Sequence, residues 1–540
     1  MLTSSCQLLG GIGLFLLGMT LLTDGLKAFA GEALRRALVR FTGTPFKAFC
    51  SGAVITVLVQ SSSATTVTVI GFVSAGLLTF PQAIGVVLGA SLGTTGTGWL
   101  VSVLGLKVSL GVWALPLVGV GTFIKLLAPG RWRSLGLALA GFGLVFIGIE
   151  TLQLAMRGFS QVLHLARLPA GGLWGHGVAM GLGILLTVVM QSSSAAVATT
   201  LTALQSGAVN FEQAASLVIG AAVGTTVTGV LAAIGGGVPA KRTALAHVVF
   251  NLASGLIALV LLPVFLWGIR QAQEHAGLDP GAVSLAAFHT GFIALGVLIF
   301  LPFAERGARI IEQWLPDRGP VLTRHLDSTV LKTPAVALEA TRRALSETAA
   351  ESFDAARSVL ENPMHAVSTA RLALPRAALA RLQEFFPQIP AVAEDDRVTR
   401  RRLAQLHALD HLARFQARWT PPGGIGTRIR DPRLQGAVRL TATLLELGAS
   451  GLRHGGPESW EVTVASKAAD LAELRRLDRP LILRETATGR SDPSTALELL
   501  DVIRWLDRLG YHAWRITHHL AHEDPSAQTL AEPDPFPDEP

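Results

Sequence analysis

The tetrapeptide Gln-Ser-Ser-Ser occurs at residues 60–63 and again at residues 191–194, each time inside a long uncharged stretch. Each copy is followed at the same distance by Gly-Ala-x-x-Gly-Thr-Thr, at residues 89–95 and 220–226. Aligning residues 52–98 with 183–229 needs no gap, and 21 of the 47 positions are identical. This is an internal repeat, and a repeat of this kind decides the architecture of the chain.

Hydropathy predicts a membrane protein with many spans. The candidate spans are residues 6–26, 48–80, 83–105, 108–128, 134–154, 175–209, 213–236, 243–267 and 283–303. As one helix, the uncharged segment 48–106 would be roughly 88 Å long, about three times the ~30 Å hydrocarbon core, so it must fold back. The serine motif interrupts this segment midway, as expected for a broken helix that lines a cavity.

Polar side chains at membrane depth are costly unless they face protein, water or a solute. Two copies of one polar cluster therefore predict one composite solute site. Serines in membrane helices often bond back to their own backbone, which is the simpler interpretation of a single triplet. Matched triplets with matched Gly-Thr-Thr partners favour the binding site.

Loop charge predicts the orientation of the spans. The loop at 27–47 carries five basic side chains, and further basic clusters lie at 125–133, 241–242 and 306–309, so these regions are expected to be cytoplasmic. The leading helices at 6–26 and 134–154 then run in opposite directions, and span 108–128 supplies the crossing that inverts the second unit. We therefore predict two inverted repeats with broken helices, at about residues 10–106 and 140–236.

Composition divides the chain. Residues 1–304 hold 14 Lys/Arg and 6 Asp/Glu, whereas residues 305–540 hold 31 and 32. We predict an all-α protein with a transmembrane domain at 1–305, a cytoplasmic helical bundle at 320–522 and a disordered tail at 523–540. The basic excess lies in membrane-flanking loops, so a nucleic-acid partner is not expected. Only Cys6 and Cys50 are present, so no disulfide framework is expected.

The doubled motif resembles the type II family of sodium-dependent phosphate symporters. The segments Leu14-Phe15-Leu16-Leu17-Gly18-Met19 and Ala246-His247-Val248-Val249-Phe250-Asn251 are also similar to that family. The resemblance covers residues 5–305 and implies that two inverted repeats bring both serine motifs to one phosphate. The phosphate ligands it implies are Gln60, Ser61, Ser62, Ser63, Gln191, Ser192, Ser193 and Ser194.

The expected coupling ion is sodium, bound by oxygen atoms near the phosphate. Residues 48–106 and 168–240 contain no Lys or Arg, so bound cations would have to neutralise a phosphate dianion. The candidate sodium ligands are Thr65, Thr66, Ser91, Thr94, Thr95, Thr225, Thr226 and Asn251. The family has Asn where this chain has Ser91 and Ala222, so the choice between sodium and a proton as the coupling ion is left open.

The C-terminal part is predicted to be a bundle of amphipathic helices. The segment Leu506-Asp507-Arg508-Leu509-Gly510-Tyr511-His512-Ala513 resembles a helix of PhoU-type phosphate regulators, and residues 409–414 are a fainter copy. PhoU proteins carry acidic pairs spaced by four that bind metal. Here Tyr511 stands where the second acid would follow Asp507, so metal binding is not expected.

These observations predict a symporter of inorganic phosphate and sodium in a bacterial inner membrane, with no further cofactor. A membrane phosphate sensor, a channel, and a transporter of another oxyanion are the alternatives, and a homodimer is left open. The sequence contains no nucleotide-binding, zinc-protease or catalytic-triad motif, so an enzyme is not expected.

Overall fold

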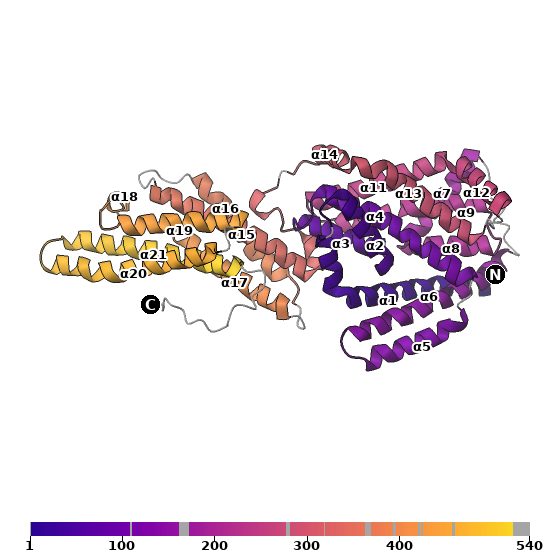
Figure 1. The fold of residues 1–540 in the computed structure, drawn as a ribbon, viewed down its shortest axis with the longest axis horizontal. Coiled ribbons are helices and arrows are strands. Elements are labelled where there is room, and N and C mark those ends of the chain that lie inside the picture. Colours follow the sequence, from indigo (N-terminus) through magenta and orange to yellow (C-terminus); the bar gives the residue numbers. More distant parts are fainter. Residues whose placement is uncertain are drawn as a thin grey trace. The chain divides into compact units, whose positions relative to one another are not determined.

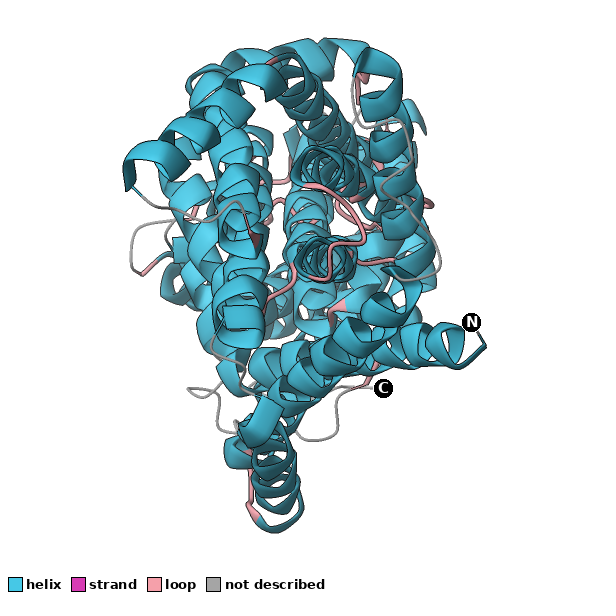
Figure 2. Ribbon diagram, turned by 90° about the vertical axis from the view of Figure 1, so that its right-hand side faces the viewer, coloured by secondary structure: helices cyan, strands magenta, loops and turns pink. Residues whose placement is uncertain are grey.

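The computed structural model describes residues 2–40, 42–107, 111–160, 172–276, 281–317, 319–361, 369–391, 396–419, 422, 425–455 and 459–521. The chain forms two compact units, residues 1–317 and 318–540, which we call the membrane unit and the helical unit. Within the described residues the secondary structure is helical and contains no strand (Figure 2). The all-α prediction is confirmed.

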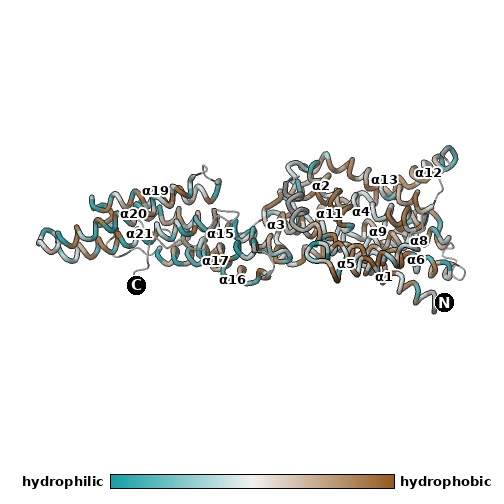
Figure 3. Tube along the Cα trace, turned by 60° about the horizontal axis from the view of Figure 1, so that its bottom comes forward, coloured by the Kyte–Doolittle hydropathy of each residue, from teal (hydrophilic) through white to brown (hydrophobic). Residues whose placement is uncertain are grey.

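The membrane unit is built from apolar helices (Figures 1 and 3). They are α1 (Leu2–Arg40), α2 (Pro45–Val59), α3 (Ser62–Ser74), α4 (Phe80–Trp99), the π-helical η1 (Leu100–Lys107), α5 (Gly111–Leu127), α6 (Arg131–Ser160), α7 (Gly172–Met190), α8 (Ser193–Gln205), α9 (Phe211–Gly224), α10 (Thr226–Ala233), α11 (Val238–Val260), α12 (Leu262–Ala276), α13 (Ala282–Phe300), η3 (Leu301–Phe303) and α14 (Ala304–Trp314).

Six helical stretches in the described residues are long and apolar enough to cross a membrane. They are Ser5–Ala30, Phe80–Leu106, Arg131–Gly158, Phe211–Ala233, Val238–Val260 and Ala282–Trp314. The predicted spans 48–80 and 175–209 are each broken at the serine motif, into α2 and α3 and into α7 and α8. The chain is thus a polytopic helical membrane protein with the interruptions that the sequence predicts.

The two repeats pack in the same way, at positions offset by 131 residues. A Cβ atom at Gly52 would overlap the carbonyl of Val86, and one at Gly183 would overlap that of Leu217. The pairs Gly89–Phe49 and Gly220–Met180 repeat the relation. Glycine thus lets α2 approach α4, and α7 approach α9, to backbone contact.

The leading helices α1 and α6 run antiparallel along a seam of small residues. Gly11 packs against Leu152, Gly18 against Val145 and Gly25 against Ala138. Opposite directions are what inverted repeats require of these two helices, and the inversion of the complete repeats stays a prediction. One expectation is wrong: α1 continues to Arg40, so most of the loop expected at 27–47 is helix.

The helical unit consists of short 3₁₀ turns followed by long helices. They are η4 (Val321–Thr323), η5 (Ser328–Lys332), α15 (Pro334–Glu361), α16 (Thr369–Phe385), η6 (Phe386–Gln388), α17 (Asp396–Ala417), α18 (Ile425–Arg428), α19 (Gln435–His454), α20 (Trp460–Ala487) and α21 (Pro493–Ala521). Helix α21 packs on α17, α19 and α20, and α15 packs on α16, α17 and α19. The predicted disordered tail at 523–540 lies outside the described residues.

Candidate functional site

Both serine motifs begin with a glutamine in the left-handed region of backbone conformation. Gln60 has φ 57° and Gln191 has φ 52°, and no other non-glycine residue in the described part of the chain has a positive φ. Glycine usually takes this role at the end of a helix, because a Cβ atom makes the conformation unfavourable. Retaining glutamine at both places points to a function for its side chain.

The next residue in each motif starts a new helix. Ser61 accepts a hydrogen bond from the Ala64 amide at 3.2 Å, and Ser192 accepts one from the Ala195 amide at 3.2 Å. Each serine thereby caps the N-terminus of α3 or α8 and leaves early amide N–H groups of that helix without an intrahelical acceptor. We call these two capped breaks, residues 60–63 and 191–194, the serine turns.

The two serine turns contact each other's repeat through equivalent residues. The hydroxyl groups of Ser63 and Thr228 lie 3.4 Å apart, and those of Ser194 and Thr97 lie 3.3 Å apart. Adding 131 to 63 and 97 gives 194 and 228, so the second pair is the first with the repeats exchanged. Such an exchange is the signature of a two-fold relation. The structure therefore brings both serine turns to one seam between the repeats.

The surroundings of the turns combine burial with neutral polar groups. Ser62, Ser193 and Ser194 are buried, whereas Ser61, Ser63 and Ser192 are partly exposed. Helices α2–α4 and α7–α10 contain Lys47 as their only Lys or Arg, and that residue lies more than two turns before the first serine turn. The positive ends of the α3 and α8 dipoles are thus the local source of positive potential.

The two glutamines differ in their contacts. Thr97 donates a hydrogen bond to Gln60 Oε1 at 3.0 Å, and the Gln60 amide donates to the Val57 carbonyl at 2.6 Å. The Gln191 amide donates in the same way to the Val188 carbonyl at 2.7 Å, but Gln191 is exposed. Gln60 is therefore held by a side chain of its own repeat, whereas Gln191 is exposed.

The candidate sodium ligands lie mainly along helices close to these turns. Thr65 donates to the carbonyl of Ser61 at 3.2 Å and accepts from Thr56 at 2.9 Å, so it belongs to the first serine turn. Thr66 is buried one residue further along α3. Thr95 accepts from Thr290 on α13 at 3.1 Å.

The other candidates bond to carbonyl groups of their own helix or of the residues just before it. These hydrogen bonds are Ser91 to Val87, Thr94 to Ala90, Thr225 to Ala221, Thr226 to Val223, and Asn251 to His247. Back-bonding of this kind uses a hydroxyl or amide proton and leaves the side-chain oxygen lone pairs available.

Sequence reasoning missed the threonines that link the repeats. Thr97 and Thr228 are identical positions of the internal alignment, three residues after Thr94 and Thr225, and that identity was the signal that could have found them. His247 and His289 are both buried, and the Nδ1 atom of each has no hydrogen-bond partner in the described residues.

The fold and the seam define the class of this protein: a polytopic helical membrane protein whose two repeats meet at paired broken helices, as in secondary transporters. The family model for the Na+/Pi-cotransporter matches residues 14–154 and 174–304. The chain belongs to this family, which is a family of transporters rather than of enzymes.

Individual relatives agree with this assignment. The chain is 35% identical over 313 residues to the uncharacterized protein YqeW of Bacillus subtilis, covering 56% of this chain and 96% of that protein. It is 30% identical over 339 residues to the "Putative inorganic phosphate export protein YjbB" of Salmonella typhimurium, covering 62% and 60%. The human sodium-dependent phosphate transport protein 2C is 31% identical over 199 residues, covering 35% and 32%. No solved structure gives a significant match.

Proposed function

We propose that this protein moves inorganic phosphate across the membrane together with sodium, and that the two serine turns hold the phosphate between them. The observation that carries the proposal is that Gln60 and Gln191, each in the left-handed backbone conformation, begin the two serine turns. Each serine turn also contacts a threonine of the other repeat through equivalent residues.

The turns offer the hydrogen-bond donors that a phosphate needs. Early amide N–H groups of α3 and α8 are free of intrahelical acceptors, and the hydroxyls of Ser62 and Ser193 stand beside them. Each glutamine amide uses one N–H on a backbone carbonyl and has a second. Two such sets, one from each repeat, give a composite anion site.

Sodium completes the charge balance. A phosphate dianion held by neutral dipoles alone is poorly compensated, because α3, α4, α8 and α9 carry no Lys or Arg. Threonine oxygens whose protons are already used along α3 and α4 and at the junction of α9 and α10 are hard ligands of the kind that sodium prefers. Thr65, Thr94 and Thr225 are the strongest candidates among those the sequence predicts, and no other cofactor is needed.

Export of phosphate is the second candidate, since the relative YjbB is named for export. A coupled transporter runs in the direction that the combined gradients set. Purified protein in liposomes with labelled phosphate would separate the cases, under an inward sodium gradient, a reversed one, and a proton gradient in sodium-free buffer. Uptake that follows the sodium gradient supports the proposal. Equal transport driven by protons alone would contradict it, and binding without transport would favour a sensor.

The same proposal assigns the chain to a bacterial inner membrane, with the helical unit as a PhoU-like cytoplasmic domain. The supporting observations are the basic clusters at 125–133 and 241–242, at the ends of α5, α6 and α11, and the separate compactness of residues 318–540. Protease added to right-side-out vesicles should spare the helical unit, and protease added to inverted vesicles should cut it. Cross-linking in those vesicles would show whether two chains associate.

A further inference from the structure

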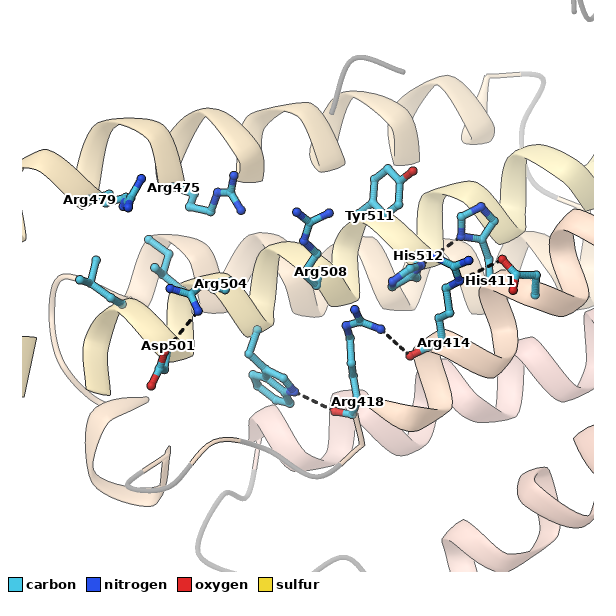
Figure 4. Close-up of a pocket in the computed structure, with 14 residues that line it drawn as sticks. His411, Arg414, Arg418, Arg475, Arg479, Asp501, Arg504, Arg508, Tyr511 and His512 are labelled. Carbon is cyan, nitrogen blue, oxygen red and sulfur yellow. Dashed lines mark hydrogen bonds and ion pairs between the residues drawn. The ribbon is translucent and has the colours of Figure 1, made fainter. Parts of the chain in front are cut away.

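The helical unit contains a large cavity lined by arginine. Helices α17, α20 and α21 enclose a pocket of about 680 Å³ (Figure 4). Six guanidinium groups line it, those of Arg414, Arg418, Arg475, Arg479, Arg504 and Arg508. Its acidic lining residues are Asp410 and Asp501, so the pocket carries a marked excess of positive charge.

Three of these arginines form ion pairs with carboxylates. Arg414 pairs with Asp410 at 3.0 Å, Arg475 with the buried Asp507 at 3.0 Å, and Arg504 with Asp501 at 3.6 Å.

Arg418 shows the resulting positive potential. Its guanidinium donates to the carbonyl of Arg414 at 3.0 Å. Partial burial, together with the charges of Arg508 and Arg414, lowers the pKa of Arg418 from its usual value. The arginines in this pocket therefore repel one another, and a bound anion would reduce that repulsion.

A buried histidine adds a neutral donor to the same pocket. Arg515 Nε donates to His411 Nε2 at 3.4 Å, and His411 Nδ1 lies 3.0 Å from His512 Nδ1. An arginine can only donate, so His411 carries its proton on Nδ1 and donates to His512 Nδ1. His512 then carries its proton on Nε2, and that atom has no hydrogen-bond partner in the described residues although the side chain is only 3% exposed.

We propose that this pocket binds a small anion that carries two or more linked phosphate groups. A guanidinium group can bind two phosphate oxygens at once, and His512, whose Nε2–H has no hydrogen-bond partner in the described residues, also lines the pocket. A volume of about 680 Å³ falls in the range of sites for ligands much larger than orthophosphate. The site lies in the helical unit and uses none of the residues of the serine turns, so it goes beyond the transport function.

Calorimetric titration of the detergent-solubilised full chain would test this. Tripolyphosphate, ATP and orthophosphate are the probes, and the Ser62→Ala/Ser193→Ala chain serves as the background in which the transport site is weakened. We expect tripolyphosphate to bind at least tenfold more tightly than orthophosphate, in the wild-type chain and in this background alike. Binding of ATP as well as tripolyphosphate assigns recognition to the phosphate chain, whereas binding of ATP alone assigns it to a nucleotide.

Two arginines of one helix give matched variants. Arg479→Gln, in the pocket, should weaken tripolyphosphate binding about tenfold, and Arg418→Gln should do the same. Arg476→Gln should leave binding unchanged, since Arg476 is 77% exposed, pairs with Glu473 and does not line the pocket. Equal affinities in Arg479→Gln and Arg476→Gln, or no preference for tripolyphosphate over orthophosphate, would overturn the proposal. Thermal unfolding of each variant shows whether a loss of binding reflects loss of fold.

Discussion

Gln60 and Gln191 hold a conformation that costs an L-residue about 1–2 kcal/mol relative to the right-handed region. Glycine would adopt it without that cost, as glycine does at residues 76 and 207 in the loops that follow α3 and α8. The same strain at equivalent positions of both repeats indicates that the amide groups matter more than the stability lost.

Replacing Gln60 with glycine separates these two effects. Gln60→Gly should keep or slightly raise thermal stability, because the turn is relieved, yet reduce phosphate transport severalfold because the amide is lost. Gln60→Ala is the matched control: it also lacks the amide but keeps the strained backbone, so it should unfold about 1 kcal/mol more easily than the glycine variant. Full transport by Gln60→Gly would show that the side chain is dispensable.

The serines give a second test at this scale. Ser62→Ala and Ser193→Ala should each weaken phosphate affinity about tenfold or more, because one donor to a buried anion is worth about 1.5–3 kcal/mol. Ser206→Ala is the control, because Ser206 lies just past the end of α8 that is far from the serine turn. Its hydroxyl group donates to the Ala203 carbonyl. Affinity is read from sodium-dependent uptake at varied phosphate. Loss of transport in one of the two variants, with normal transport in the other, would contradict a shared phosphate site.

For single residues, the sequence predicts that the two serine motifs come together but not which backbone conformation and hydrogen bonds they adopt. The serine turns were visible from their repetition, and their helix-capping role follows from serine chemistry. The left-handed glutamines were not predictable, because few residues other than glycine, Asn and Asp adopt that conformation. Thr97 and Thr228 were missed because a position in an alignment does not reveal a contact across the fold.

Among the elements, α1 and α6 show what hydropathy can and cannot predict. The apolar core of each helix was located within a few residues, since about twenty apolar residues are needed to span a bilayer. The extension of α1 to Arg40 was missed, because residues after the span are polar and carry no membrane signal. Because α1 and α6 pack antiparallel along their glycines, the C-terminal end of α1 and the N-terminal end of α6 lie on the same side of the membrane.

Single cysteines would test that arrangement. With Cys6 and Cys50 replaced, Gly43→Cys and Ala128→Cys should react with an impermeant reagent from the same side, because the α1–α6 register places the C-terminal end of α1 beside the start of α6. Gly172→Cys, at the first residue of α7, should react from the opposite side if the repeats are inverted. Labelling of all three from one side would refute inversion.

The histidines of α17 and α21 predict a pH dependence of the helical unit. Burial, helped by nearby arginines, lowers the pKa of His411 to about 4 and those of His512 and His519 to about 3. These folded-state values lie below the unfolded value near 6.5, so their contribution to stability is complete above about pH 6.5. It is lost as the pH falls toward 4, by at most about 1.4 kcal/mol per pH unit for each histidine.

Hydrogen exchange of α17 and α21 peptides measures this loss, after correction for the intrinsic rate. We expect clearly weaker protection at pH 5 than at pH 7. His519→Gln should flatten the dependence, whereas His454→Gln, at an exposed position in the last turn of α19, should not. Equal protection at both pH values would show that these histidines titrate normally.

For the whole molecule, composition alone predicts two kinds of protein in one chain. The proportion of charged residues rises near residue 305, and the boundary between the two compact units falls between residues 317 and 318 of the sequence. Amphipathic periodicity predicts the helical bundle, but α20 runs through Pro480 to Ala487, although proline usually ends or kinks a helix. The arginine pocket could not be predicted, because its lining comes from three helices whose packing no local pattern encodes.

The exchanged contacts across the seam have a further consequence, which concerns motion. Each half of the seam uses the same residue types, yet Gln60 is bonded to Thr97 while Gln191 is exposed. If the halves trade conformations, Thr228 should close on Gln191 and Gln60 should open, with no change in which helices touch. We therefore predict a second conformer that is the repeat-swapped counterpart of this one.

Disulfide trapping would reveal both conformers. Gln60→Cys/Thr97→Cys should lock the state seen here, and Gln191→Cys/Thr228→Cys should lock its counterpart, with reduction restoring mobility in each. Because Gln60 and Gln191 take part in binding, the readout is which loop cysteines become protected, rather than transport. Failure of the second pair to cross-link while the protein cycles would exclude the exchange. Because the same turn occurs in both repeats, either copy can be the closed one. We therefore expect the two conformers to open toward opposite faces of the membrane.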